Sequence, residues 1–154
     1  MRIDYSFDLS VNDKKLEKAV QAGEYDEVNP NITSKNFPSV RMKPDVRVDL
    51  ACFSQVISTP EALEEFSKMG YRPANLPELL ALGEKQPDMQ LGFPMVTLDP
   101  VITLDENDNF CFPCLTSHGR RRVLDLVYPN SNGENGEEGK NWARAYRFAI
   151  VRVG

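Results

Sequence analysis

Cysteine and histidine are scarce in this 154-residue chain, which has three cysteines and one histidine. A small, odd number of cysteines does not suit a disulfide framework, and a chain of this length can bury a core without one. The cysteine content agrees instead with a reducing compartment. His118, the single histidine, is a candidate general base. The sequence spacing places no nucleophile and no orienting third group with it.

Surplus basic charge and long apolar runs are also lacking. The chain has 18 Lys and Arg against 23 Asp and Glu, a formal net charge of -5, whereas nonspecific nucleic-acid binding needs surplus Lys and Arg. No apolar run approaches the roughly 20 residues that cross a bilayer, and the first 15 residues hold no apolar signal core. We therefore expect a soluble, cytoplasmic single domain, with neither nucleic acid nor membrane as partner. The oligomeric state stays open.

Two helix starts and two helix stops stand close together in residues 58–84. Ser58 and Glu61 have the spacing of a capping box, and so do Asn75 and Glu78. Apolar residues follow each start at helical intervals, and a glycine ends each run. The two glycines are Gly70 and Gly83. We expect two short helices whose apolar sides meet one sheet face, through Leu63, Phe66, Leu79, Leu80, Val48 and Leu50.

Period-two patterns predict strands on both sides of this helix pair. The expected strands span residues 3–9, 46–56, 95–98, 101–104, 110–115, 121–128 and 145–153. A short helix ending at Gly23 and an irregular connection complete an N-terminal extension, residues 1–44, before a core of residues 45–154. Residues 129–141 are polar and Gly-rich, which predicts an exposed loop. The pattern is typical of an α+β fold with two short helices on a mainly antiparallel sheet.

One group of residues could support inorganic chemistry. Cys111 and Cys114 have C-x-x-C spacing, His118 follows, and Cys52 would complete a Cys3His zinc set. A straight strand would place Cys111 and Cys114 on opposite faces, so a shared metal requires a turn at Pro113. The alternatives are thiols that pack as small apolar groups and a redox pair, which would need a helix N-terminus. We expect packed thiols and no cofactor, with zinc as the competing hypothesis.

The final segment suggests a ligand surface. Trp142, Arg144, Tyr146 and Arg147 combine the aromatic and cationic side chains that dominate binding hot spots. The structural alternative is that Trp142 anchors the last strand to the core. The run of three arginines at 120–122 lies beside a turn and predicts a solvated face.

Two resemblances add expectations about the fold. The Gly70–Pro73 turn between two helices, with Trp142 and the closing segment RFAIVRVG, resembles the C-type-lectin-like fold over about residues 46–154. The similarity is to the branch of formylglycine-generating enzymes and the variable proteins of diversity-generating retroelements. It does not carry over the oxidase activity, because no copper-binding cysteine follows Cys114. The whole chain, including residues 22–38, also resembles an uncharacterised family of small bacterial proteins, which implies no function.

The residues and resemblances together favour a noncatalytic ligand-binding or protein-interaction module of unknown specificity. Its expected partner is a protein or a small molecule. The competing hypothesis is a small metalloprotein or enzyme centred on Cys111, Cys114 and His118. No residue is assigned a catalytic role.

Overall fold

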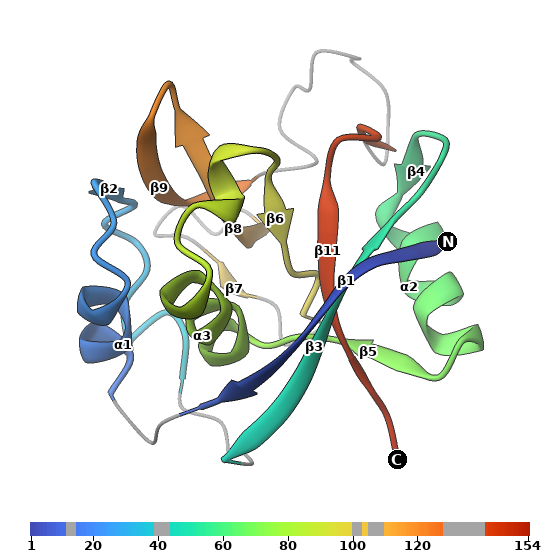
Figure 1. Cartoon of the computed structure of the whole chain (residues 1–154), viewed down its shortest axis with the longest axis horizontal. Coiled ribbons are helices and arrows are strands. Elements are labelled where there is room, and N and C mark those ends of the chain that lie inside the picture. Colours follow the sequence, from blue (N-terminus) through green and yellow to red (C-terminus); the bar gives the residue numbers. More distant parts are fainter. Residues whose placement is uncertain (12–14, 39–43, 100–102, 105–109, 128–140) are drawn as a thin grey trace.

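The computed structural model describes residues 1–11, 15–38, 44–99, 103–104, 110–127 and 141–154 (Figure 1). Its helices are α1 (Leu16–Ala22), α2 (Thr59–Lys68), α3 (Leu76–Lys85) and the 3-10 helix η1 (Met89–Leu91). Its strands are β1 (Arg2–Ser10), β2 (Glu27–Val28), β3 (Asp45–Cys52), β4 (Ile57–Ser58), β5 (Tyr71–Pro73), β6 (Met95–Val96), β7 (Thr103–Leu104), β8 (Phe110–His118), β9 (Arg121–Val127), β10 (Asn141–Trp142) and β11 (Arg147–Arg152). In these ranges no helix is both long and apolar enough to cross a bilayer. Of the expected loop at 129–141, residues 129–140 lie outside the described residues, and Asn141 begins β10.

The main sheet is mixed and mostly antiparallel. Its order is β1-β3-β11-β6-β8-β9-β2, with β5 also paired to β11 and β7 to β8, while β4 and β10 form a separate pair. Only the β11–β6 and β2–β9 pairings among the described strands are parallel. The predicted α+β class with a mainly antiparallel sheet is therefore confirmed. The N-terminal strand belongs to the same sheet as the final strand.

The two central strands, β3 and β11, are covered on both faces. Side chains alternate along a strand, so Val48 and Leu50 join one core cluster while Ala51 joins another. On β11, Ala149 faces the first cluster and Phe148 the second. This explains why residues 48–52 are buried without interruption. We call these clusters the α3-side core and the α2-side core, after the helices that cover them.

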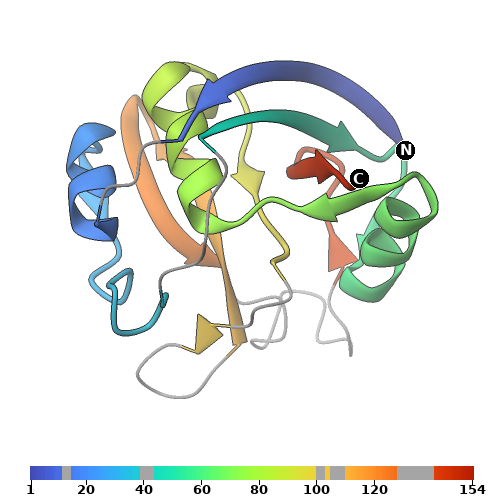
Figure 2. The same cartoon turned by 90° about the horizontal axis from the view of Figure 1, so that it is seen from below.

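The two helices do not share a sheet face as expected. Leu79 and Leu80 of α3 pack with Val48 and Leu50, as predicted, but Phe66 belongs to the α2-side core, and Leu63 packs against it. The reason is β5, which the sequence reading treated as a plain connection. It pairs with β11, and the chain crosses the sheet there between α2 and α3. Figure 2 shows the two helices at opposite ends of β5.

Both predicted capping boxes are present. The Ser58 and Asn75 side chains accept from the backbone N–H three residues on, and the Glu61 and Glu78 carboxylates accept from the cap N–H groups. After α2, Gly70 has φ +82° and turns the chain in the left-handed region, which favours glycine. The expected stop at Gly83 is wrong.

Helix α3 runs through Gly83 to Lys85, so this glycine does not end the helix. Its lack of a side chain instead allows Tyr25 to pack closely against α3. A Cβ at Gly83 or at Gly23 would collide with the side chain of Tyr25, which fills the space between α1 and α3. The signal that suggested a helix stop therefore reflects packing against a residue 58 positions earlier in the chain.

Arg122 binds the ends of two helices and corrects the expectation of a solvated arginine run. Its Nη1 donates to the Gly23 carbonyl at 2.5 Å, its Nη2 donates to the Gly83 carbonyl at 3.0 Å, and its Nε donates to the Pro87 carbonyl at 2.7 Å. The guanidinium also lies 4.7 Å from the ring centroid of Tyr25. Carbonyls at helix C-termini lack intrahelical partners and favour a nearby cation. Arg122 thus joins α1, α3 and β9.

Two tyrosines with buried hydroxyls should differ in how much stability they lose on replacement by phenylalanine. The Tyr25 hydroxyl finds no hydrogen-bonding partner among the described residues, and burial raises its pKa to about 12. The Tyr71 hydroxyl instead donates to Asp49 Oδ2 at 2.8 Å, and Tyr71 and Asp49 are each only 7% exposed. We expect Tyr25→Phe to change the free energy of unfolding by less than about 0.5 kcal/mol, and Tyr71→Phe to lower it by about 2 kcal/mol. Urea unfolding of both variants measures this; equal losses would contradict it.

Candidate functional site

The cysteines of the C-x-x-C segment point to different cores. β8 is continuous through this segment, and Cys111 is buried in the α3-side core while Cys114 is buried in the α2-side core. The expected placement on opposite faces is therefore confirmed. Burial raises the pKa of the Cys114 thiol, and the charge of Asp125 raises it further. This thiol is therefore protonated at neutral pH and packs as a small apolar group.

The other two predicted ligands have separate partners. Cys52 Sγ donates to Asp4 Oδ2 at 3.4 Å, and His118 Nδ1 lies 3.4 Å from Glu27 Oε2 at the exposed end of β8. Within the described ranges, no three His, Cys, Asp or Glu side chains come close enough to hold one metal ion. The Cys3His set of the competing zinc hypothesis is not assembled among the described residues.

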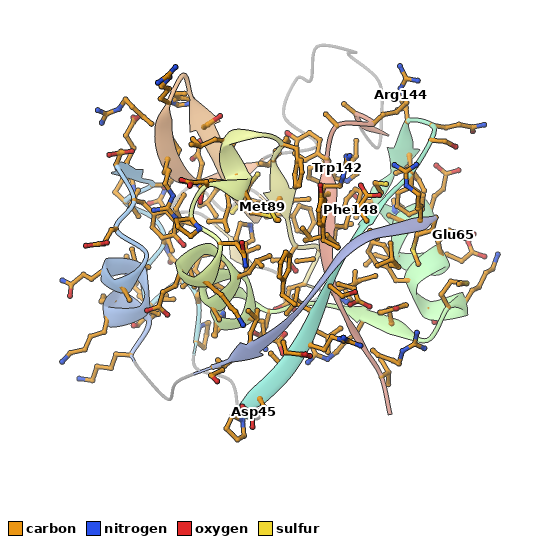
Figure 3. All side chains as sticks on the ribbon, in the orientation of Figure 1. Asp45, Glu65, Met89, Trp142, Arg144 and Phe148 are labelled. Atoms are coloured by element: carbon orange, nitrogen blue, oxygen red, sulfur yellow. The ribbon has the colours of Figure 1, made fainter. Side chains whose placement is uncertain are left out.

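The candidate aromatic and cationic residues lie close together in sequence, from β10 to the start of β11, but do not share an exposed surface. Trp142 is only 3% exposed, and its Nε1 donates to Thr59 Oγ1 at 2.8 Å. Tyr146 packs edge-on against the indole, with ring centroids 5.0 Å apart. Figure 3 shows Trp142 and Phe148 inside the molecule and Arg144 at its periphery. The placement of Trp142 matches the structural alternative, an anchor between the last segment and α2.

Arg147 is used to join the first and last strands. Its Nε lies 2.7 Å from Asp4 Oδ2, and its guanidinium lies 4.8 Å from the ring centroid of Phe93. Burial alone would raise the pKa of Asp4, but hydrogen bonds from Arg2 and Cys52 and the charge of Arg147 hold it below its ordinary value. Asp4 therefore remains a carboxylate. The register of β1 against β3 shifts between Ile3 and Tyr5, so Asp4 occupies the bulge.

A groove that the sequence did not indicate is lined by the N-terminal residue, the segment that leads into β4, and α2. Figure 1 shows the N-terminus, β4 and α2 on the same side of the molecule. The groove has a volume of about 310 Å³. Its lining comprises Met1, residues 53–57 and three glutamates of α2, namely Glu61, Glu64 and Glu65. We call it the α2 groove. It combines apolar side chains with carboxylates on one accessible surface.

The floor of the α2 groove is fixed by the core beneath it. The ring of Phe53 packs on Phe66 and Phe148, with centroid separations of 6.2 and 5.7 Å. Ile57 pairs with Trp142 across the β4–β10 ladder, and Trp142 is hydrogen-bonded to Thr59, the first residue of α2. The tryptophan chosen from the sequence as a ligand contact thus supports the groove from behind.

The rim of the α2 groove is acidic. Glu61 Oε1 accepts from the Ser58 N–H at 3.0 Å, and the hydrogen bonds from Ser58 lower its pKa. Glu64 and Glu65 lie 3.4 and 3.8 Å from Lys68 Nζ, on side chains that are largely exposed. Two of the three carboxylates, Glu64 and Glu65, therefore share one lysine, and Glu61 is bound to the backbone of Ser58. Exposed pairs of this kind are weak, so they leave the carboxylates available.

A signal for this site is present in the sequence but is not specific. Glu61, Glu64 and Glu65 have i, i+3, i+4 spacing, which places them on one side of a helix. The spacing does not predict the opposing loop, because residues 53–56 reach this position through the path of the preceding strand, β3. The interpretation of α2 as an amphipathic helix was correct and said nothing about its polar side.

A second hollow of about 340 Å³ lies where β1 and β3 meet near their far ends, lined by residues 8–10 and 45–47. Its two opposite charges face each other, with Arg47 Nε 3.3 Å from Asp8 Oδ1. The apolar residues of this hollow are the buried Leu9 and the partly buried Val46, whereas the α2 groove presents the exposed Val56. The α2 groove is the stronger candidate for a binding site.

Comparison of the chain with protein-family models, curated proteins and solved structures finds no match. The resemblances to the C-type-lectin-like fold and to a family of small bacterial proteins therefore stay predictions. The candidate site rests on the geometry of the described residues alone.

Proposed function

We propose that this protein is a noncatalytic protein-interaction module and that the α2 groove is its binding surface. The observation that carries the proposal is the exposure of Val56, which is 54% accessible at the mouth of a groove whose floor is continuous with the core. When a partner covers such a side chain, its apolar area is removed from water, and this stabilises the complex.

The size of the groove favours part of a polypeptide over an enclosed small molecule. About 310 Å³ lies at the lower end of the range of small-molecule sites, which bury most of their ligand. A space of this size accepts one or two side chains of a partner while the backbone of the partner stays outside. The rigid floor under Phe53 suits such a partner because little ordering is needed on binding.

The positions of the candidate catalytic residues support an enzyme less well than the α2 groove supports a binding module. The sequence offered Cys111, Cys114 and His118 as the centre of a reactive site, and in the structure these side chains lie on two faces and at an exposed hairpin end. A nucleophile and its base must lie within hydrogen-bonding reach. The binding function is therefore the better supported of the two hypotheses.

The test compares two matched valine substitutions. Peptides of twelve residues are selected from a random display library against the wild-type protein, and their affinities are measured for Val56→Asn and Val153→Asn. Val153 is 59% exposed and lies outside the groove. Covering the exposed half of Val56 is worth about 1 kcal/mol, so we expect Val56→Asn to weaken binding about fivefold and Val153→Asn to leave it unchanged.

Thermal unfolding of both variants serves as the control, and neither substitution should lower the melting temperature appreciably because both side chains are exposed. Selected peptides that bind Val56→Asn as well as wild type would place the binding surface elsewhere on the molecule and would remove the support for this proposal.

A further inference from the structure

We infer that the segment bound by the α2 groove is cationic, with a lysine or arginine next to a large apolar residue. The inference rests on the proposed function and specifies the chemistry of the partner. The groove places carboxylates on one wall and apolar groups on the other, so a ligand must satisfy both. A purely apolar segment would leave the carboxylates desolvated without a partner, which is costly.

The carboxylates differ in what they can offer. Glu61 Oε1 is fixed by the N–H of Ser58 in the capping box, so it provides a stationary negative charge at one end of the groove. Glu64 and Glu65 have side chains that are 66% and 40% exposed. They retain the freedom to turn toward a ligand. Electrostatic attraction in the groove therefore comes mainly from these two residues.

Lys68 shows how a cation can be held on this side of α2. Its ammonium lies 3.4 Å from Glu64 Oε1 and 3.8 Å from Glu65 Oε1, contacting both carboxylates at once. Each pair is exposed and weak. A ligand ammonium or guanidinium that gains apolar contacts in the groove can displace it. Lys68 is thus an intramolecular competitor for the cation site.

The apolar wall fixes where the second ligand group would lie. Val56 is exposed, while Phe53 and Ile57 are partly buried and rest on the α2-side core. Glu64 and Val56 line the same groove, so adjacent or alternate residues of one peptide can reach both. We therefore expect the bound peptide to carry a lysine or arginine within two residues of a leucine, isoleucine or phenylalanine.

The competitor role of Lys68 gives a test in which two substitutions on one helix change affinity in opposite directions. The probe is a fluorescein-labelled twelve-residue peptide that alternates lysine and leucine, and fluorescence anisotropy measures its dissociation constant. We expect Glu64→Gln to weaken binding and Lys68→Gln to strengthen it, each by about 1.5- to 5-fold. Higher salt should reduce both effects because the charges are exposed.

Two distant substitutions with the same charge changes serve as controls. Asp88→Asn and Lys18→Gln replace exposed side chains outside the groove, and both should leave the dissociation constant unchanged. A peptide with glutamate in place of lysine should not bind. Val56→Asn should weaken binding of the lysine peptide about fivefold, as in the display experiment.

The outcomes separate the partner chemistry from the binding function. Any of three results would overturn the cationic partner: the lysine peptide does not bind, the glutamate peptide binds equally well, or Lys68→Gln does not gain affinity. In each case, library peptides whose binding is weakened by Val56→Asn would still support the groove as the binding surface. If the lysine peptide binds but Val56→Asn, Glu64→Gln and Asp88→Asn act alike, the attraction is to the acidic protein as a whole, and this inference is wrong.

Discussion

Replacing Phe66 with alanine is expected to lower the free energy of unfolding by about 3–5 kcal/mol, because the substitution removes a buried aromatic side chain and leaves a cavity. Phe66 is 1% exposed and packs against the rings of Phe53 and Phe148. Urea denaturation with an unchanged m-value measures the effect. The loss should also loosen Phe53, which rests on it, and hence the floor of the α2 groove.

Met69 supplies the control for this prediction because it follows α2 directly and is largely exposed. Met69→Ala should cost less than about 0.5 kcal/mol, as is usual for surface positions. A loss of less than about 1 kcal/mol for Phe66→Ala would contradict the packing of α2 on its own face of the sheet.

Replacing Arg122 with alanine is expected to lower the free energy of unfolding by about 2–4 kcal/mol, since several charge-assisted hydrogen bonds are lost and two of their acceptors, the Gly23 and Gly83 carbonyls, belong to buried residues. The carbonyls of Gly23, Gly83 and Pro87 each accept from this one guanidinium. Arg122→Lys should recover little of the stability, because an ammonium cannot reproduce the planar fork that reaches three carbonyls.

The neighbouring Arg121 is a matched control on the same strand. Its Nε lies 3.2 Å from Glu27 Oε2, between side chains that are 60% and 43% exposed. Exposed pairs contribute little, so Arg121→Ala should change stability by less than about 1 kcal/mol. Equal losses for the two arginines in urea unfolding would show that Arg122 is a surface residue after all.

The sequence predicts local structure well where a short segment determines it. Both capping boxes and the start of β3 could be placed because their signals lie within a few residues, but β3 ends at Cys52 and not at Val56 as expected. The crossing of the sheet through β5 could not, because three residues, Tyr71–Pro73, carry no strand period. Gly83 misled for a related reason: its lack of a side chain serves Tyr25, which is distant in the sequence.

The candidate site was harder to foresee than the fold. Trp142 was singled out as a candidate ligand contact, but its indole is buried and supports the groove without lining it. Arg122 stood in a charge run that resembled a solvated face, and only the convergence of three distant carbonyls gives it a role. A binding surface made by a loop and the polar side of a helix has no sequence period of its own.

The most direct test of the binding surface is a chemical-shift titration of the isotope-labelled protein with the lysine–leucine peptide. Amide shifts should be largest for residues 53–57 and for Glu61, Glu64 and Glu65, which line the α2 groove, and the methyl signal of Met1 should shift with them. Shifts at the β8–β9 hairpin and at α1 should stay small. Changes centred on any other surface, or scattered over all acidic residues, would contradict the assignment of the α2 groove as the site of partner binding.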